Sequence, residues 1–416
     1  MYCPVCKQKY DSKFCPECGT KLVEEANNVN IYGSVRYNSS QNIHNTDNSV
    51  HHTTNITQIS VNGIGITEII PQTCSNSVNR HRIRTEYEII DGNGFIPDDI
   101  TSIIASAFEG CKNLTKIAIP HGVTSIGQRA FLGCTNLVQV TIPESVTTIA
   151  PGAFAFCEKL VEITIPNSIT NIGDSAFEGC INLIRVNLPV GITRIGNYAF
   201  ESCKNLTNIT IPRGVTYIGN CSFRNCHQLT NITIPERVTY LGDCAFGFCK
   251  NINYISIPAS ITEISHALFQ GCENLINISL PNNIKNIESL AFDGCVKLQN
   301  IVLPNSLTSI GGFAFSGCNF TYVIIPNSVK SIGQCAFNAC RKLSNINIPN
   351  GIACIEQCTF AGCKQLRMIT IPNNITRIDL SAFAACDNLT LIRIPKRTIV
   401  SEKAFTDSPN VSIVRY

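Results

Sequence analysis

The chain has no tryptophan and only 2 methionines, and charged residues make up just 15% of its 416 positions. It contains no run of Lys and Arg long enough to follow a phosphate backbone, and its net charge is only +3, so nucleic acid is an unlikely partner class. No stretch approaches the roughly 20 apolar residues of a membrane helix. The residues from Met1 to Pro4 lack the basic and apolar regions of a secretory signal, so we expect a cytoplasmic protein.

Cysteine, in contrast, is abundant, with 23 residues. The odd number and the regular spacing favour reduced thiols over a disulfide scaffold.

Four cysteines near the start form two CxxC pairs, Cys3 with Cys6 and Cys15 with Cys18. Such turns can place four thiolates around one tetrahedral Zn²⁺, and a segment this short needs the metal to fold. We predict a zinc ribbon over residues 1–24 with one structural zinc ion and no open position for catalysis. A redox CxxC and a rubredoxin-like iron site are the alternatives.

Residues 25–94 are rich in Asn, Ser, Thr and His, which indicates a polar linker. Apolar and polar residues partially alternate from Asn55 to Ile70, so a short strand or an N-terminal cap is conceivable there. His51 and His52 could contact a metal, although solvated side chains in a polar loop are the simpler interpretation.

From residue 95 to 416 the sequence repeats every 23 residues. A Pro recurs once in each repeat, and a Cys follows each marker Phe by three positions in all repeats except the last, where Ser408 takes its place. The marker residues are Phe108, Phe131, Phe154, Phe177, Phe200, Phe223, Phe246, Phe269, Phe292, Phe315, Phe337, Phe360, Phe383 and Phe405.

One repeat, Asn113 to Cys134, shows how a coil is built. Ile117 and Ile119 alternate with outward residues, which predicts a strand that Pro120 ends. A second short extended piece and a tight helical turn complete the coil. A single coil cannot bury its apolar residues, whereas stacked coils can. The predicted fold is therefore a mainly β repeat solenoid, with one parallel-sheet strand and one short helical turn per coil.

The pattern LxxIxIPxxVTxIGxxAFxGC resembles the BspA-type leucine-rich repeat over about 320 residues. The resemblance implies a curved leucine-rich-repeat superhelix that serves in protein recognition or adhesion. It also implies that members are often secreted and attached to the cell surface.

Two departures from the repeat stand out. Only 22 residues separate Cys318 from Cys340, so we expect a local irregularity there. The last coil is shortened, and we predict a C-terminal cap from about residue 396.

The thirteen repeat cysteines should form an inward ladder in which Cys acts as a small apolar filler. A second set lies two positions before the marker Phe: Cys221 and Cys244 in adjacent coils, and Cys335 and Cys358 in adjacent coils. Each pair could approach disulfide distance. Small residues replacing Ala or Ser are the simpler interpretation.

The outward positions of the predicted strands are polar in the middle of the chain and more apolar toward its end. We predict a partner-binding patch from the apolar members of this set, because aromatic residues and Met are enriched in interface cores. Ordinary strand-forming residues on a solvated sheet are the alternative. The predicted patch consists of Tyr254, Val302, Tyr322, Ile324, Met368 and Leu391.

No Walker or Rossmann motif occurs, and His121, His227 and His266 fall at different repeat phases. We therefore predict a non-enzymatic protein-interaction module or scaffold. An exported bacterial surface adhesin is the alternative, and a regulator that contacts nucleic acid through the zinc ribbon is the least favoured.

Overall fold

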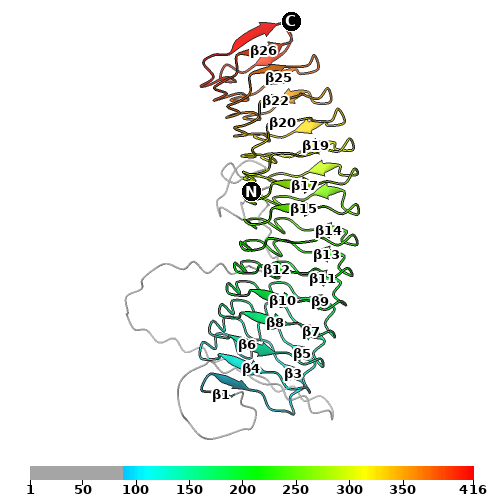
Figure 1. Ribbon diagram of the computed structural model, residues 1–416, viewed down its shortest axis with the longest axis vertical. Helices are drawn as coiled ribbons and strands as arrows, with labels where there is room; N and C mark the ends of the chain where they lie inside the picture. The colour runs from blue at the N-terminus through cyan, green and yellow to red at the C-terminus, as the bar shows by residue number, and fades with distance from the viewer. Residues whose placement is uncertain (1–87) are drawn as a thin grey trace, which may run out of the picture. The chain divides into compact units, whose positions relative to one another are not determined.

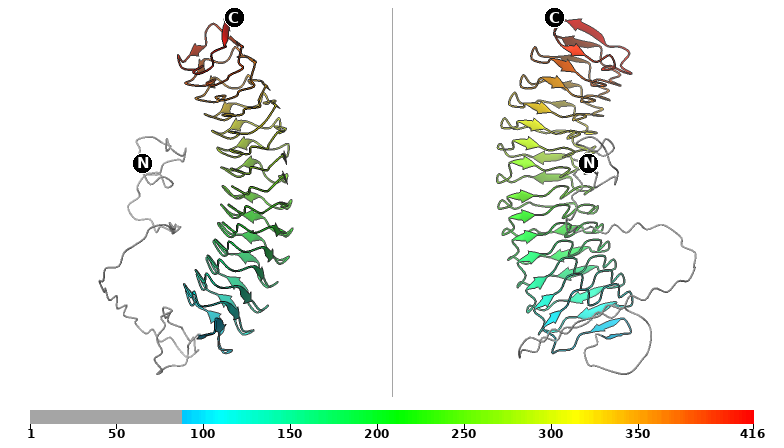
Figure 2. Two further views of the ribbon diagram at one scale, coloured as in Figure 1. Left: turned by 60° about the vertical axis from the view of Figure 1, so that its left-hand side comes forward. Right: turned by 180° about the vertical axis from the view of Figure 1, so that it is seen from behind.

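A computed structural model describes residues 88–416 of the protein. This part of the chain winds into a curved stack of coils, and it contains 28 short strands and no helix (Figures 1 and 2). The strands of successive coils pair in parallel, about one repeat apart. The predicted repeat solenoid is confirmed. The zinc ribbon and most of the linker lie outside the described residues.

In most coils the first strand carries a buried residue next to exposed ones, as in Lys116–Ala118 and Gln139–Thr141. Neighbouring coils pair in register, with Ile117 opposite Val140 and Lys116 opposite Gln139. These strands are β2 (Asn93–Phe95), β4 (Lys116–Ala118), β6 (Gln139–Thr141), β8 (Glu162–Thr164), β10 (Arg185–Asn187), β12 (Asn208–Ile209), β15 (Tyr254–Ser256), β17 (Asn277–Ser279), β20 (Tyr322–Val323), β22 (Asn345–Ile346), β24 (Met368–Thr370), β26 (Leu391–Ile394) and β28 (Ser412–Arg415).

The second extended piece of each coil is also a strand, so a second face of parallel sheets runs along the stack. Each of these strands is only two residues long, and the second residue points inward. They are β3 (Ser102–Ile103), β5 (Ser125–Ile126), β7 (Thr148–Ile149), β9 (Asn171–Ile172), β11 (Arg194–Ile195), β13 (Tyr217–Ile218), β14 (Tyr240–Leu241), β16 (Glu263–Ile264), β18 (Asn286–Ile287), β19 (Ser309–Ile310), β21 (Ser331–Ile332), β23 (Cys354–Ile355), β25 (Arg377–Ile378) and β27 (Ile399–Val400).

The predicted helical turn is a single turn that bonds to its neighbour in the stack. Arg129 and Gly133 have positive φ angles of 57° and 70°, so the backbone does not continue into a helix. The N–H groups of Arg129, Phe131 and Gly133 donate to carbonyls of the next coil at 3.0, 2.8 and 2.8 Å. The turn therefore adds a third line of hydrogen bonds between coils.

The core is a ladder of identical side chains. The marker Phe rings stack on one another from Phe108 to Phe405, with centroids 5.0 Å apart at the first step and 5.7 Å at the last. The Cys three residues after each marker Phe, from Cys134 to Cys386, is buried and donates its Sγ–H to the carbonyl of a Phe one coil earlier, as Cys180 does to Phe154 at 3.2 Å. The predicted inward ladder is confirmed, and its thiols are free from Cys134 onward, whereas Cys111 is disulfide-bonded.

Both ends of the described stack are covered. At the first end, β1 (Glu88–Ile90) forms an antiparallel hairpin with β2. At the other end, β28 pairs in parallel with β26, and the Tyr416 hydroxyl donates to the Ile371 carbonyl at 2.6 Å. Ser408 replaces the ladder Cys and donates to the Phe383 carbonyl at 2.7 Å, so the hydroxyl preserves the bond that the thiol makes elsewhere.

In the repeat that is one residue shorter, a larger side chain keeps the core filled. Phe320 occupies the position where other coils have Leu or Ile, and it is fully buried. Its ring meets Phe315 edge to face, with centroids 5.6 Å apart and an interplanar angle of 72°. A larger side chain thus fills the space at the coil that is one residue shorter.

Candidate functional site

The first-strand face divides into two halves of different character. Outward residues of the early coils are mostly polar or charged, such as Lys116, Glu162 and Arg185, although Phe95 of β2 is also exposed. Outward residues of the later coils include most of the large apolar side chains on this face. Since the pleat directs alternate residues outward, these side chains cannot reach the core of their own coil.

Five of the six residues of the predicted patch are well exposed. The exposed fraction is 54% for Tyr254 and 59% for Tyr322, and it reaches 71% for Ile324. Val302 and Met368 are exposed as well. Leu391 is the exception, because it is half-buried in β26 beneath the C-terminal coil.

The structure brings these residues into groups. Val302 occupies the outward position one coil before Ile324, and Ile324 follows the end of β20, two residues after Tyr322, so these three are neighbours. Met368 pairs with Leu391 between β24 and β26. Asn345 of β22 separates Tyr322 from Met368. Tyr254 stands apart, since β17 and one further coil lie between it and Tyr322. We call Val302, Tyr322, Ile324 and Met368 the apolar patch.

A side chain of the neighbouring coil fixes the backbone beside the apolar patch. The Asn347 amide donates to the Ile325 carbonyl at 2.8 Å, and the Ile325 N–H donates to its Oδ1 at 2.7 Å. The strand that carries Ile324 is thereby held in place. A preorganised apolar surface loses little conformational entropy when it binds.

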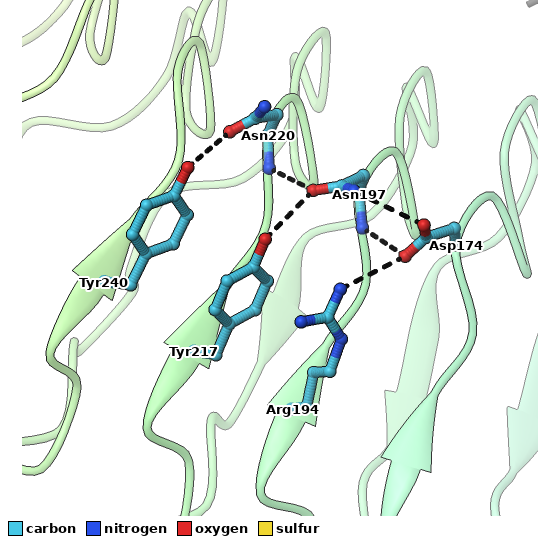
Figure 3. Close-up of polar contacts among 6 residues, drawn as sticks. All are labelled: Asp174, Arg194, Asn197, Tyr217, Asn220 and Tyr240. Carbon is cyan, nitrogen blue, oxygen red and sulfur yellow. Dashed lines mark hydrogen bonds and ion pairs between the residues drawn. The ribbon is translucent and has the colours of Figure 1, made fainter. Parts of the chain in front are cut away.

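A second aromatic feature lies on the second-strand face (Figure 3). The Arg194 guanidinium lies 3.9 Å from the centroid of the Tyr217 ring, and the rings of Tyr217 and Tyr240 stack at 4.6 Å with planes 7° apart. These residues belong to β11, β13 and β14, which pair in register. We call Arg194, Tyr217 and Tyr240 the tyrosine stack.

A polar ladder supports the tyrosine stack. The Asn197 N–H donates to Asp174 Oδ1 and the Asn220 N–H donates to Asn197 Oδ1, both at 2.9 Å. The Tyr217 hydroxyl donates to Asn197 at 3.3 Å and the Tyr240 hydroxyl donates to Asn220 at 3.1 Å. Figure 3 shows both tyrosines pointing at this ladder. We call Asp174, Asn197 and Asn220 the Asn ladder.

The Asn ladder was not predicted from the sequence. A signal for it exists: a short polar residue follows the Gly of four consecutive coils. Burial raises the pKa of Tyr240, with a further contribution from Tyr217, so its phenol remains protonated and able to donate. Both hydroxyls are therefore engaged within the protein.

The four predicted zinc ligands, Cys3, Cys6, Cys15 and Cys18, lie outside the described residues. Within residues 88–416, Cys354, Glu356 and Asp379 present ligand atoms within 4.8 Å of one another. However, Arg377 donates to Cys354 Sγ at 3.4 Å and to Asp379 at 2.8 Å. Arg377 thus already pairs with two of these three potential ligands, and the group forms an ion-pair cluster.

The parallel coils, the buried ladders and the two outward faces define a protein of the leucine-rich-repeat class. The chain matches a family model for the BspA type leucine rich repeat region over residues 92–207, 193–302 and 285–412. The chain belongs to this family, as the repeat pattern predicted. The repeats support a role in protein interaction or adhesion.

The chain is similar to several solved structures. A leucine rich cell surface protein from Faecalibacterium prausnitzii is 28% identical, with 77% of this chain and 78% of that one covered and a TM-score of 0.39. A leucine-rich repeat protein from Bacteroides ovatus is 24% identical over 78% and 94% of the two chains, with a TM-score of 0.45. The pneumococcal vaccine antigen PcpA is 20% identical over 76% and 85%, with a TM-score of 0.51. Comparison with curated proteins finds no match.

Proposed function

We propose that the chain is a recognition protein that binds a protein partner through the apolar patch on the first-strand face. The observation that supports this proposal is the exposure of Val302, Tyr322, Ile324 and Met368 on one face of the solenoid, with exposed fractions between 59% and 85%. Scattered exposed apolar residues are normal on any protein, but a local group on one face is typical of an interaction site.

The apolar patch fits an uncharged, partly apolar protein surface better than it fits a highly charged partner. Neighbouring outward positions are the amides Asn300 and Asn345, which provide hydrogen bonds around the apolar centre without adding charge. Such an arrangement, an apolar centre with a polar rim, is the usual anatomy of protein interfaces. Tyr322 is the residue that we expect to contribute most to binding.

The proposal is tested by pairing a double variant with a matched control. Tyr322→Ser combined with Ile324→Ser removes the centre of the patch, and we expect the affinity for the protein partner to fall at least about tenfold, which corresponds to about 1.4 kcal/mol. Tyr254→Ser, three coils away, should change it little. A partner that binds the double variant as tightly as the parent chain would contradict the proposal.

The second candidate is more specific: a recognition protein of the cell surface, adhesin-like in role. Membership of the BspA-type family supports it, because the family resemblance implies surface attachment more often than a cytoplasmic location. Among residues 88–416 no helix has the length and apolar character needed to cross a membrane. Fractionation of the producing cells distinguishes this candidate from the cytoplasmic location that we expected from the N-terminal residues.

For residues 1–24 we propose a structural zinc ribbon, supported by the spacing of Cys3, Cys6, Cys15 and Cys18. The purified full-length chain should then contain one zinc ion. Cys15→Ser combined with Cys18→Ser should abolish zinc binding and leave the thermal unfolding of the solenoid unchanged. Zinc retained by this variant would rule out the proposed ligand set.

A further inference from the structure

A column of thirteen residues, one in each coil except the last, has the same unusual backbone. It lies two positions before the marker Phe, and all thirteen of its members have a positive φ, between 51° and 66°. The N–H group of each member donates to a carbonyl in the next coil, as that of Cys221 does to Asp243 and that of Cys335 does to Gln357. The members are Ser106, Arg129, Gly152, Ser175, Tyr198, Cys221, Cys244, Ala267, Leu290, Phe313, Cys335, Cys358 and Ser381.

Within this column, cysteines occur only in pairs that occupy adjacent coils. Cys221 is followed by Cys244 in the next coil, and Cys335 is followed by Cys358. A small filler residue would have no reason to occur in adjacent pairs, whereas a function that needs two sulfurs would. All four thiols are partly exposed, in contrast to the buried ladder cysteines from Cys134 to Cys386.

The spacing of the coils fits a covalent bridge between these neighbours. The marker Phe rings beside the cysteine pairs indicate how far apart the coils lie. The ring centroids of Phe223 and Phe246 are 5.5 Å apart, and those of Phe337 and Phe360 are 5.7 Å apart. Disulfides join residues whose Cα atoms are about 4.4–6.8 Å apart. The repeating backbone hydrogen bonds hold the two cysteines of each pair in register.

The first pair also has the electrostatics of a reactive dithiol. A hydrogen bond from Cys221 lowers the pKa of the Cys244 thiol, and the nearby Arg224 guanidinium lowers it further against the effect of burial. The same hydrogen bond, together with burial, raises the pKa of Cys221. Cys244 is thus the better nucleophile and Cys221 holds the shared proton.

We propose that Cys221 with Cys244, and Cys335 with Cys358, are thiol–disulfide exchange sites that accept a small or protein disulfide as oxidant and become bridges between adjacent coils. At the first site, the Cys244 thiolate attacks one sulfur of the oxidant, forms a mixed disulfide and releases a thiolate that takes up a proton. The Cys221 sulfur, on losing its proton, attacks Cys244 Sγ and releases the second oxidant thiol. Two protein thiols are oxidised by two electrons, and one oxidant disulfide is reduced to two thiols.

The experiment uses the reduced full-length chain, with glutathione disulfide as oxidant and peptide mass spectrometry without reductant as readout. Besides the disulfide of Cys111, we expect two bridged peptide pairs, Cys221–Cys244 and Cys335–Cys358, each lighter than the reduced form by two hydrogens. The ladder cysteines should react with an alkylating agent only after unfolding, since burial raises the pKa of the Cys180 thiol to about 12.

Cys221→Ser provides the matched control. Serine is accepted at this backbone position, since Ser175 and Ser381 occupy it with φ angles of 55° and 56°. The variant should accumulate a glutathione adduct on Cys244, while the Cys335–Cys358 bridge still forms. If the parent chain shows persistent glutathione adducts without bridges, or all four thiols remain free under the same oxidant, the proposal is wrong. The readout does not depend on partner binding.

Discussion

The two outward faces of the solenoid both carry aromatic residues, but they hold them in different ways. On the second-strand face, Tyr217 and Tyr240 stack on each other and donate their hydroxyls to the Asn ladder. On the first-strand face, Tyr322 lies beside Ile324 with 59% of its surface exposed. The two tyrosines that stack and form hydrogen bonds within the protein stabilise the coils. The exposed side chains of Tyr322 and Ile324, in contrast, remain available to contact a partner. This difference supports a structural role for the second-strand face and the proposed recognition role for the first-strand face.

The largest effect should come from the Phe ladder that supports both faces. Phe246→Ala removes a fully buried ring from between Phe223 and Phe269, and we expect a loss of about 3–5 kcal/mol in the free energy of unfolding. Denaturant unfolding measures the loss, and hydrogen exchange should show it spreading to the adjacent coils on both faces. A cost below about 1 kcal/mol would mean that the ring stack is not the main support.

The tyrosine stack provides the direct contrast between the faces. Replacing Tyr217 and Tyr240 together by Ala should lower the free energy of unfolding by about 1–3 kcal/mol, because a stacked pair and two hydrogen bonds are lost. Replacing Tyr254 and Tyr322 by Ala should lower it by less than about 0.5 kcal/mol, as expected for exposed side chains. Equal losses in the two double variants would remove the distinction between the faces.

Replacing the buried Ser222 should raise the free energy of unfolding, whereas the substitutions above should lower it. Its hydroxyl has no hydrogen-bond partner in the described part of the chain, and Ala199 and Ala245 occupy the equivalent positions of the adjacent coils. Ser222→Ala should raise the free energy of unfolding by about 1 kcal/mol, since an unsatisfied buried hydroxyl is lost.

Thr359 is the matched control for that prediction. It occupies the same position in a later coil, but its hydroxyl donates to the Glu356 carbonyl at 2.7 Å. Thr359→Ala should therefore not stabilise the protein. Stabilisation of both variants to the same extent would show that the missing partner of Ser222 has no energetic consequence.

The smallest effect concerns the charge at the end of the Asn ladder. Asp174 lies 3.6 Å from Arg194, and both side chains are more than a third exposed. Asp174→Asn should lower the free energy of unfolding by about 0.5 kcal/mol or less, because solvent screens the pair. The difference between variant and parent should shrink further at high salt. A large cost at high salt would point to the hydrogen bonds to Asn197 instead of the charge.

Much of the interior followed from the 23-residue period, because identical side chains at one phase must meet when coils stack. The Phe ladder, the Cys ladder and the inward Ile positions are all where that period placed them. The second-strand face was harder to foresee, since strands of two residues carry no periodicity of their own. Their pairing depends on the neighbouring coil.

The turn was the least predictable element. Residues such as Arg129, Tyr198 and Phe313 have positive φ angles, although their side chains do not favour that conformation. The hydrogen bonds to the next coil impose it, so the sequence of a single repeat gives no local signal. For the same reason the thiol pairs could be noticed in the sequence, whereas their shared backbone geometry could not.

Site-specific photo-crosslinking in the producing cells tests the assignment of recognition to the first-strand face most directly. A photoreactive residue is placed in turn at positions 322 and 324 of the apolar patch and at positions 217 and 240 of the tyrosine stack. The account predicts that positions 322 and 324 crosslink to the same protein partner and that positions 217 and 240 do not. Crosslinks to a partner from 217 and 240, with none from 322 and 324, would contradict it.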